Sequence, residues 1–276
     1  MSGTKVAWLC EALQVSRSGY YEWLRRCHRP CARRQRDADL LGKIREIFAA
    51  KQKAYGSPRV TRELNGAAGR HRVARLMRQA HLVARQRSKY RPKGTDSRHG
   101  YPVAPNHLKE LQVERVDQAW AMDATYVLTA QGWLYVTAAI DVHSRRIVGW
   151  SMSDNLDTPA AIAALRMACQ QRRPTGPVMV HSDRGTQFAN HAFRAELQRH
   201  GFVASMSRKG NCYDNAFIES FWSSMKLEMI KRTRFRTRDE ARTAVFRYIE
   251  SFYNRERLHS SLGYLSPVSF ESLPPQ

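Results

Sequence analysis

Three acidic side chains, far apart along the chain, occupy positions from which they could act together chemically. Asp123 lies inside an apolar, strand-like run, Asp183 follows a short apolar run, and Glu219 lies within a long helical pattern. A carboxylate inside a buried strand is costly unless it is paired or binds a metal ion. We therefore predict that Asp123, Asp183 and Glu219 are catalytic and bind metal.

Carboxylates brought together raise one another's pKa unless cations intervene. Hard divalent cations resolve this, and magnesium keeps water positions open for phosphate oxygens. Two such ions ~3.5–4 Å apart can activate an attacking oxygen and stabilise a leaving one. The pattern predicts two magnesium (or manganese) ions and in-line phosphoryl transfer on nucleic acid.

In the helix that carries Glu219, successive residues are ~100° apart around the axis, and this spacing shows which residues share a face. Its apolar stripe consists of Ile218, Phe221, Trp222, Met225 and Met229. An adjacent stripe consists of Asn215, Glu219, Ser223 and Lys226. Lys226, two turns after Glu219 on one face, is predicted to bind DNA through a phosphate.

These residues require a scaffold of alternating elements. Strands are expected over 120–128, 133–140, 147–152, 178–181 and 202–206, and helices over 158–169, 192–200, 215–230 and 239–253. This order predicts an α/β fold with a mixed sheet and flanking helices. We place a catalytic core at 116–230 and a C-terminal helical extension at 231–276. The expected inner stripe of the last helix is Val245, Phe246, Ile249 and Phe252.

Several other conspicuous residues are expected to be structural. Asp141 has the position of a turn-initiating residue, and Asp214 that of a helix N-cap. Three tryptophans, Trp133, Trp150 and Trp222, are more often core residues than base-stacking platforms. His181 either orients the loop at Asp183 or is simply packed. Arg257 and His259 either contact DNA or, slightly favoured, close the C-terminal segment structurally.

Composition points to a polyanionic partner. The 276 residues include 46 Lys+Arg against 24 Asp+Glu, a net charge of +22, which favours contact with nucleic acid. Residues 1–115 hold 26 of these basic residues and only 9 acidic ones. The alternatives are a ribosomal-type basic protein, or charge that only keeps the protein soluble. The second is weak because solubility does not require basic residues concentrated in one region.

The sequence shows none of the features that direct a protein into a membrane or out of the cell. It has no apolar run of membrane-spanning length and no export signal. Its five cysteines include no Cys-x-x-Cys pair. We expect no membrane contact and a protein of the cytoplasm with reduced thiols.

The basic front end divides into a small helical unit at 1–35, a basic helix-turn-helix-like unit at 36–93 and a linker at 94–115. In the first unit, Ser16 or Ser18 could cap a helix that buries Tyr20, Trp23 and Leu24. In the second, helical patterns flank Asn65-Gly66, the arrangement of a helix-turn-helix. An ordinary helical bundle with a basic face is the alternative. The residues predicted to bind DNA here are Arg72, Arg75 and Arg78 on the second helix, followed by Arg85, Arg87, Lys89 and Arg91.

Thirty-five residues separate Asp183 from Glu219, and Lys226 follows seven residues later. This spacing resembles the Asp, Asp-35-Glu pattern of retroviral-integrase-like DDE transposases, and the closer resemblance is to the OrfB proteins of the insertion-sequence-three family. The motifs that carry it are Trp120-x-x-Asp123-x-Thr125-Tyr126, Asp141-x-x-Ser144-Arg145-x-Ile147-Val148-Gly149-Trp150, His181-Ser182-Asp183-Arg184-Gly185, Asp214-Asn215-Ala216 and Tyr253-Asn254-x-x-Arg257-x-His259.

The resemblance implies a ribonuclease-H-like core preceded by an all-α, helix-turn-helix-like region. It also implies DNA strand cleavage at insertion-sequence ends and strand transfer through a 3′-hydroxyl. Implied partners are the element's terminal repeats, target DNA, the upstream-frame OrfA protein or its frameshift fusion, and further copies of the chain on DNA. The implied location is the bacterial cytoplasm, at the nucleoid. Rival interpretations are an inactive DNA-binding regulator derived from a transposase, and a nuclease that cuts without joining.

Overall fold

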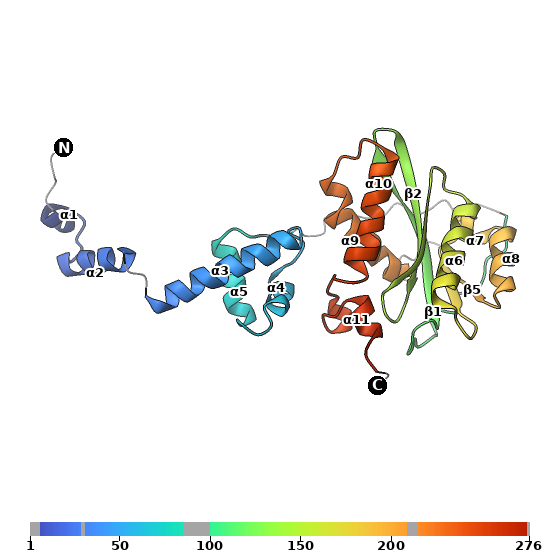
Figure 1. Cartoon of the computed structure of the whole chain (residues 1–276), viewed down its shortest axis with the longest axis horizontal. Coiled ribbons are helices and arrows are strands. Elements are labelled where there is room, and N and C mark those ends of the chain that lie inside the picture. The colour runs from blue at the N-terminus through green and yellow to red at the C-terminus, as the bar shows by residue number, and fades with distance from the viewer. Residues whose placement is uncertain (1–5, 29–30, 85–99, 209–214, 275–276) are drawn as a thin grey trace. The chain divides into compact units, whose positions relative to one another are not determined.

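The computed structural model describes residues 6–28, 31–84, 100–208 and 215–274. The chain divides into two compact units, Met1–Arg85 and Gln86–Gln276 (Figure 1). In the described ranges, every helix is too short or too polar to span a bilayer. The finer boundaries at residues 35, 93, 115 and 230 stay predictions.

The first unit is helical. Its described helices are α1 (Val6–Ala12), α2 (Arg17–His28), α3 (Ala32–Ala50), α4 (Ser57–Glu63) and α5 (Arg70–Gln79). The predicted cap of α2 is confirmed, because the Ser16 hydroxyl accepts a hydrogen bond from the Gly19 amide at 3.0 Å. The predicted burial of Trp23 is wrong, since 59% of this residue is exposed. Two short helices have too little facing surface to cover so large a side chain.

Helices α3, α4 and α5 pack around a small core. Leu40, Ile44 and Phe48 of α3 are buried together with Val60 of α4, and with Val73, Leu76 and Met77 of α5. Gly66 between α4 and α5 has φ of +83°, a conformation that favours glycine. The predicted helix, break and second helix are therefore confirmed.

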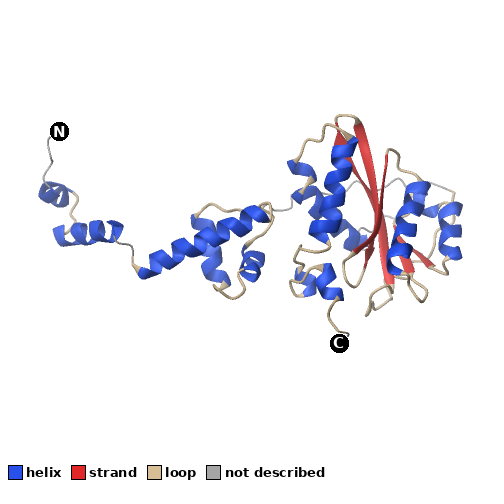
Figure 2. Ribbon diagram, in the orientation of Figure 1, coloured by secondary structure: helices blue, strands red, loops and turns tan. Residues whose placement is uncertain are grey.

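The second unit is built on a sheet. In its described part, five strands pair in the order β3-β2-β1-β4-β5. Their bounds are β1 Ala119–Thr129, β2 Gly132–Asp141, β3 Ile147–Ser153, β4 Met179–Ser182 and β5 Val203–Met206. β1, β2 and β3 form an antiparallel meander, whereas β4 runs parallel to β1 and β5 parallel to β4. Figure 2 shows the strands in one layer with helices on both sides. The five predicted strands are confirmed to within two residues.

Helices cover both faces of this sheet. α6 (Thr158–Arg172), α7 (Thr186–Ala189) and α8 (His191–Arg199) lie on one face, and α9 (Ala216–Glu228) and α10 (Arg238–Phe246) on the other (Figure 1). Each side encloses an apolar core. At Gly149 of β3, an added Cβ would lie 2.2 Å from the Ala164 carbonyl oxygen of α6. Only glycine permits so close an approach.

The helix expected over 239–253 is confirmed in extent, since helical structure runs without a break from Arg238 to Tyr253. After α10 the chain continues as a π-helical segment, Arg247–Tyr253, and then reaches a 3-10 turn, Ser260–Leu262, and α11, Pro267–Glu271. Up to Ile249 the buried residues keep the spacing of an α-helix, and Phe246 lies beside that stripe. Val245, Tyr248, Ile249 and Tyr253 are buried, whereas Phe246, predicted to face inward, is 49% exposed.

The architecture is therefore a ribonuclease-H-like α/β fold, with a mixed sheet between two helical layers and an all-α unit before it. This confirms the predicted fold class.

Candidate active site

Asp123 lies on β1 at the point where β4 stops pairing with it. The parallel β1–β4 register ends at Met122 opposite Ser182, so Asp123 is the next residue of β1. Its Oδ1 accepts a hydrogen bond from the Ala124 amide (2.8 Å) and its Oδ2 one from Trp222 Nε1 (3.1 Å). Burial, together with the charges of Asp183 and Glu219, raises the pKa of Asp123 to about 8.

Asp183 directly follows Ser182, the last residue of β4. Since Ser182 is the register partner of Met122, the two aspartates leave adjacent strands at the same level. Asp183 Oδ1 accepts a hydrogen bond from the Gly185 amide at 2.9 Å. Parallel strand ends therefore bring two carboxylates from distant sequence positions to one edge of the sheet.

Glu219 comes from the first turn of α9, which packs on β1 and β2. Ile218, Phe221, Trp222 and Met225 bury the predicted apolar stripe of this helix, which leaves Glu219 half-buried at its border. Burial and the Asp183 charge raise the pKa of Glu219. Asp183 thus acts electrostatically on both other members of the predicted trio.

Lys226, two turns further along α9, is half-buried. Its Nζ lies 5.3 Å from the centre of the Tyr126 ring. Burial lowers the pKa of Lys226, and the attraction of Asp123 opposes that effect. The predicted lysine therefore lies within electrostatic reach of the first carboxylate.

The donor set is chemically suited to hard divalent cations, because it consists of carboxylate oxygens with no sulfur or imidazole. Across the described ranges, however, no three His, Cys, Asp or Glu side chains lie close enough together to hold one metal ion. Burial and neighbouring negative charge raise the pKa of both Asp123 and Glu219, an effect that a bound cation would reverse.

Two residues at this site make polar contacts that were not predicted from the sequence. Trp222 was expected only as core, yet its indole N–H is the donor to Asp123. Asn215 is buried, and its Nδ2 donates weakly to the Met122 carbonyl oxygen (3.5 Å), while its Oδ1 has no hydrogen-bond partner among the described residues. For Asn215, the sequence did contain an indication of this position, because Asn215 lies on the same helix face as Glu219. Asp214, the predicted N-cap, lies outside the described residues.

A buried ion pair anchors the other end of α9. Arg257 Nη2 lies 2.8 Å from Glu228 Oε1 and also donates to the Ser224 hydroxyl at 3.1 Å. The Tyr248 hydroxyl donates to Glu228 Oε2 at 2.8 Å. Arg257 therefore closes the C-terminal segment onto α9. This agrees with the structural role that was slightly favoured over DNA contact.

Asp141 and His181 are two further residues for which the sequence suggested a structural role. The carboxylate of Asp141 accepts hydrogen bonds from the amides of His143 and Ser144 (3.0 and 2.8 Å), which confirms a turn-initiating role. His181 is buried between the hydroxyls of Ser205 and Ser207, at 2.9 and 3.1 Å, which favours the packed interpretation.

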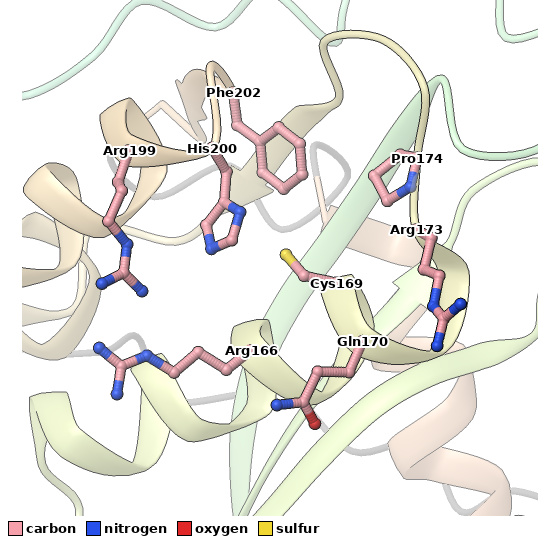
Figure 3. Close-up of a pocket in the computed structure, with 8 residues that line it drawn as sticks. All are labelled: Arg166, Cys169, Gln170, Arg173, Pro174, Arg199, His200 and Phe202. Atoms are coloured by element: carbon pink, nitrogen blue, oxygen red, sulfur yellow. The ribbon is translucent and has the colours of Figure 1, made fainter.

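A cavity of about 380 Å³ lies elsewhere on this unit, between the C-terminal ends of α6 and α8 (Figure 3). Cys169, Gln170, His200 and Phe202 are among its lining residues, and none of the three carboxylates is. Burial raises the pKa of the Cys169 thiol to about 11, so it remains protonated. This cavity is separate from the carboxylate site.

On the first unit, Arg72 and Arg75 of α5 both pair with Asp37 of α3, each at 2.7 Å. With Arg33 and Arg36 they line a cavity of about 330 Å³. Arg78 is exposed. One carboxylate faces four guanidinium groups here, so a positive surplus remains. Arg85, Arg87, Lys89 and Arg91 lie outside the described residues.

Comparisons with known proteins agree with this architecture. An integrase core domain family matches residues 113–212, a second integrase core domain family matches 200–267, and an HTH-like domain family matches 34–90. The "Insertion element IS600 uncharacterized 31 kDa protein" of Shigella sonnei is 42% identical over 266 residues, covering 95% of this chain and 97% of that protein. "Transposase InsF for insertion sequence IS3A" of Escherichia coli (strain K12) is 40% identical over 268 residues, covering 96% and 93%.

Two solved structures are also similar. One is a simian T-cell lymphotropic virus intasome in complex with PP2A regulatory subunit B56 gamma, with a TM-score of 0.49 and 12% identity over 83% of this chain and 74% of that chain. The other is the catalytic core domain of BIV integrase, with a TM-score of 0.41 and 15% identity over 55% and 92%. The assignment rests on the sequence matches: the chain belongs to the family of DDE-type transposases with an integrase core that includes the InsF transposases of IS3 insertion sequences.

Proposed function

We propose that this chain cuts DNA at the ends of its insertion sequence and joins those ends to target DNA by in-line phosphoryl transfer. Asp123, Asp183 and Glu219 are the proposed catalytic carboxylates. The observation that supports this most directly is geometric: the β1–β4 register ends at Met122 opposite Ser182, so Asp123 and Asp183 leave adjacent strands at the same level, and α9, with Glu219 in its first turn, packs on β1. Buried carboxylates are normally paired with cations or bind metal ions.

The same three residues would hold two divalent ions, magnesium or manganese. When bound, such ions supply Lewis-acid stabilisation of the attacking and leaving oxygens. The side chains themselves contribute negative charge and orientation. The hydrogen bond from Trp222 Nε1 holds Asp123 Oδ2 toward α9, and the Gly185 amide holds Asp183 Oδ1 at the end of β4.

Lys226 is proposed to bind the phosphate next to the cleaved bond. It is the cation on the Glu219 face of α9, and Asp123 attracts it. Replacing Lys226 by Ala should weaken strand joining, whereas full joining by that variant would contradict the assignment.

The helix-turn-helix-like unit is proposed to grip the DNA backbone. Arg78 is exposed, and Arg72 and Arg75 are oriented by Asp37 beside Arg33 and Arg36. Each lost phosphate contact reduces the dependence of log K on log[salt] by about 0.9. Arg75→Ala and Arg78→Ala should therefore weaken binding to any DNA sequence and lower that slope. The proposed contacts of Arg85, Arg87, Lys89 and Arg91 can be tested in the same way.

An upstream-frame OrfA protein, or its frameshift fusion, and further copies of the chain are proposed partners on DNA. Sedimentation of the chain with and without end-sequence DNA and OrfA would measure both associations.

The central experiment separates binding, cutting and joining. Labelled DNA that ends in the element's terminal repeat is incubated with the chain, Mg²⁺ and a supercoiled target plasmid. Asp123→Asn, Asp183→Asn and Glu219→Gln should each lower cleavage by at least about 100-fold, the scale of losing one major electrostatic contribution, while DNA binding persists. Asp239→Asn, on a side chain that is 93% exposed, is the matched control.

Wild-type cleavage by any one of the three variants would remove that residue from the site. Bound but uncut DNA with the wild-type chain would instead favour a regulator, and cut but unjoined DNA a nuclease. Omission of the divalent ion should abolish cutting and leave binding by the first unit unchanged.

A further inference from the structure

An exposed aromatic patch lies close to the proposed site. Tyr126, Leu128 and Trp133 are 51%, 60% and 43% exposed. The rings of Tyr126 and Trp133 meet edge to face, with centres 4.9 Å apart and planes inclined by 80°. Trp133 was expected in the core, and that prediction is wrong.

The sheet topology explains this exposure. Leu128 pairs with Trp133, and Tyr126 with Tyr135, so these side chains share one face of the β1–β2 hairpin. It is the face on which α6 packs, but α6 covers β3 and the adjacent part of β2. Figure 2 shows the hairpin strands extending past the helices on that side. The end of the hairpin therefore presents aromatic rings that no described element buries.

Lys226 links this patch to the carboxylates. Its Nζ lies 5.3 Å from the Tyr126 ring centre, and Asp123 attracts the same ammonium group. Tyr126 follows Asp123 by three residues, which is about 10 Å along a strand. That distance is about three stacked nucleotides at ~3.4 Å each.

Between Met122 and Thr129, β1 pairs with β2, while its pairing with β4 has already ended. Strand alternation places Asp123 on the α9 face and Tyr126 on the opposite face. A nucleic-acid strand that crosses this edge of β1 would meet Asp123, then Lys226, then Tyr126.

We propose that Tyr126 and Trp133 form a stacking platform for an unpaired nucleobase of the DNA strand whose phosphate lies at the carboxylates. This inference rests on the proposed function and adds a specific contact to it. Exposed aromatic rings beside a cation are the combination that binds single-stranded DNA, because rings stack on bases while the cation attracts the backbone. The net charge of +22 favours the same partner.

A second copy of the chain is a poorer occupant. Three exposed side chains at a hairpin end fall far short of the roughly 20–30 residues per side of a standard protein interface. A fully paired duplex also fits less well, since its bases are already stacked on one another. Unpairing is least costly at a frayed or cut end, which is where a transposase acts.

The test uses the 276-residue chain without divalent ions, so that no cleavage occurs. Two forked duplexes are compared, one with an unpaired thymine beside the junction and one with an abasic residue there. The wild-type chain should bind the first about tenfold more tightly, the scale of one stacked base. In Trp133→Ala and Tyr126→Ala this ratio should fall to about one, and in Trp133→Phe most of it should remain.

Phe246→Ala, which removes an exposed ring from α10, is the matched control and should leave the ratio unchanged. A thermal melt verifies that each variant is folded. The proposal is overturned if the wild-type ratio is one, or if Trp133→Ala weakens both duplexes equally. It is also overturned if the variants change sedimentation of the free chain and not the ratio. Because cleavage is absent, loss of the proposed carboxylate chemistry would leave this measurement interpretable.

Discussion

Arg257→Met is predicted to destabilise the catalytic unit strongly. Arg257 and Glu228 side chains are each only 7% exposed, and their closest N–O distance is 2.8 Å. The substitution removes the guanidinium group from both Glu228 oxygens and leaves that carboxylate, within the described part of the chain, a hydrogen bond from the Tyr248 hydroxyl. Breaking a buried pair from one side costs about 3–5 kcal/mol, because a buried charge loses its compensation.

Urea unfolding measures this cost, and a thermal melt provides a second reading. A unit of about 190 residues shifts its Tm by roughly 2–4 °C per kcal/mol, so we expect a decrease of about 6–20 °C. Arg255→Met, two residues earlier on an exposed side chain, is the matched control and should change stability by less than about 0.5 kcal/mol.

A double-mutant cycle measures the interaction between Arg257 and Glu228 directly. Adding Glu228→Gln to Arg257→Met removes the uncompensated charge, so the double variant should lose less stability than the sum of the two single variants. A loss below about 1 kcal/mol in Arg257→Met, or strict additivity in the cycle, would refute the account of this ion pair.

Three further stability predictions concern the same unit. Gly149→Ala places a methyl group 2.2 Å from the Ala164 carbonyl oxygen and should cost at least about 1–3 kcal/mol in urea unfolding, so an unchanged midpoint would contradict that close approach. Asp157→Ala removes the N-cap of α6, whose carboxylate accepts a hydrogen bond from the Ala160 amide at 3.0 Å, and should cost about 1 kcal/mol, with Asp157→Asn as a nearly neutral control. The Arg166 guanidinium lowers the pKa of Glu196 to about 2, so its stabilisation is present above about pH 4.5 and disappears as pH falls toward 2. Glu196→Gln should therefore flatten the acid limb of a stability–pH curve, and an unchanged limb would count against this ion pair.

Local pattern was sufficient for much of the fold. The five strands follow from runs of β-branched and aromatic residues, and the apolar stripe of α9 follows from helical period. The pattern failed for the burial of two apolar side chains. Phe246 lies one residue beyond the buried stripe of Ala241, Val245, Tyr248 and Ile249 and is exposed, and α6 packs on β3 and β2 without reaching Trp133, which is also exposed. An apolar residue type does not by itself give its burial, which depends on the side of the helix that packs and on how far a neighbouring element extends.

The amino-acid sequence by itself determined which residues are chemically conspicuous: a carboxylate within an apolar strand, two more at characteristic spacing, and a lysine on the same helix face as Glu219. Only the tertiary structure decided their surroundings. Parallel pairing of β1 with β4 brings Asp123 and Asp183 to adjacent strand ends, Trp222 donates to Asp123, and Asp37 orients Arg72 and Arg75. Residue type and period are local properties, whereas a hydrogen-bond partner or an uncovered face depends on segments far apart in the chain that meet only after folding.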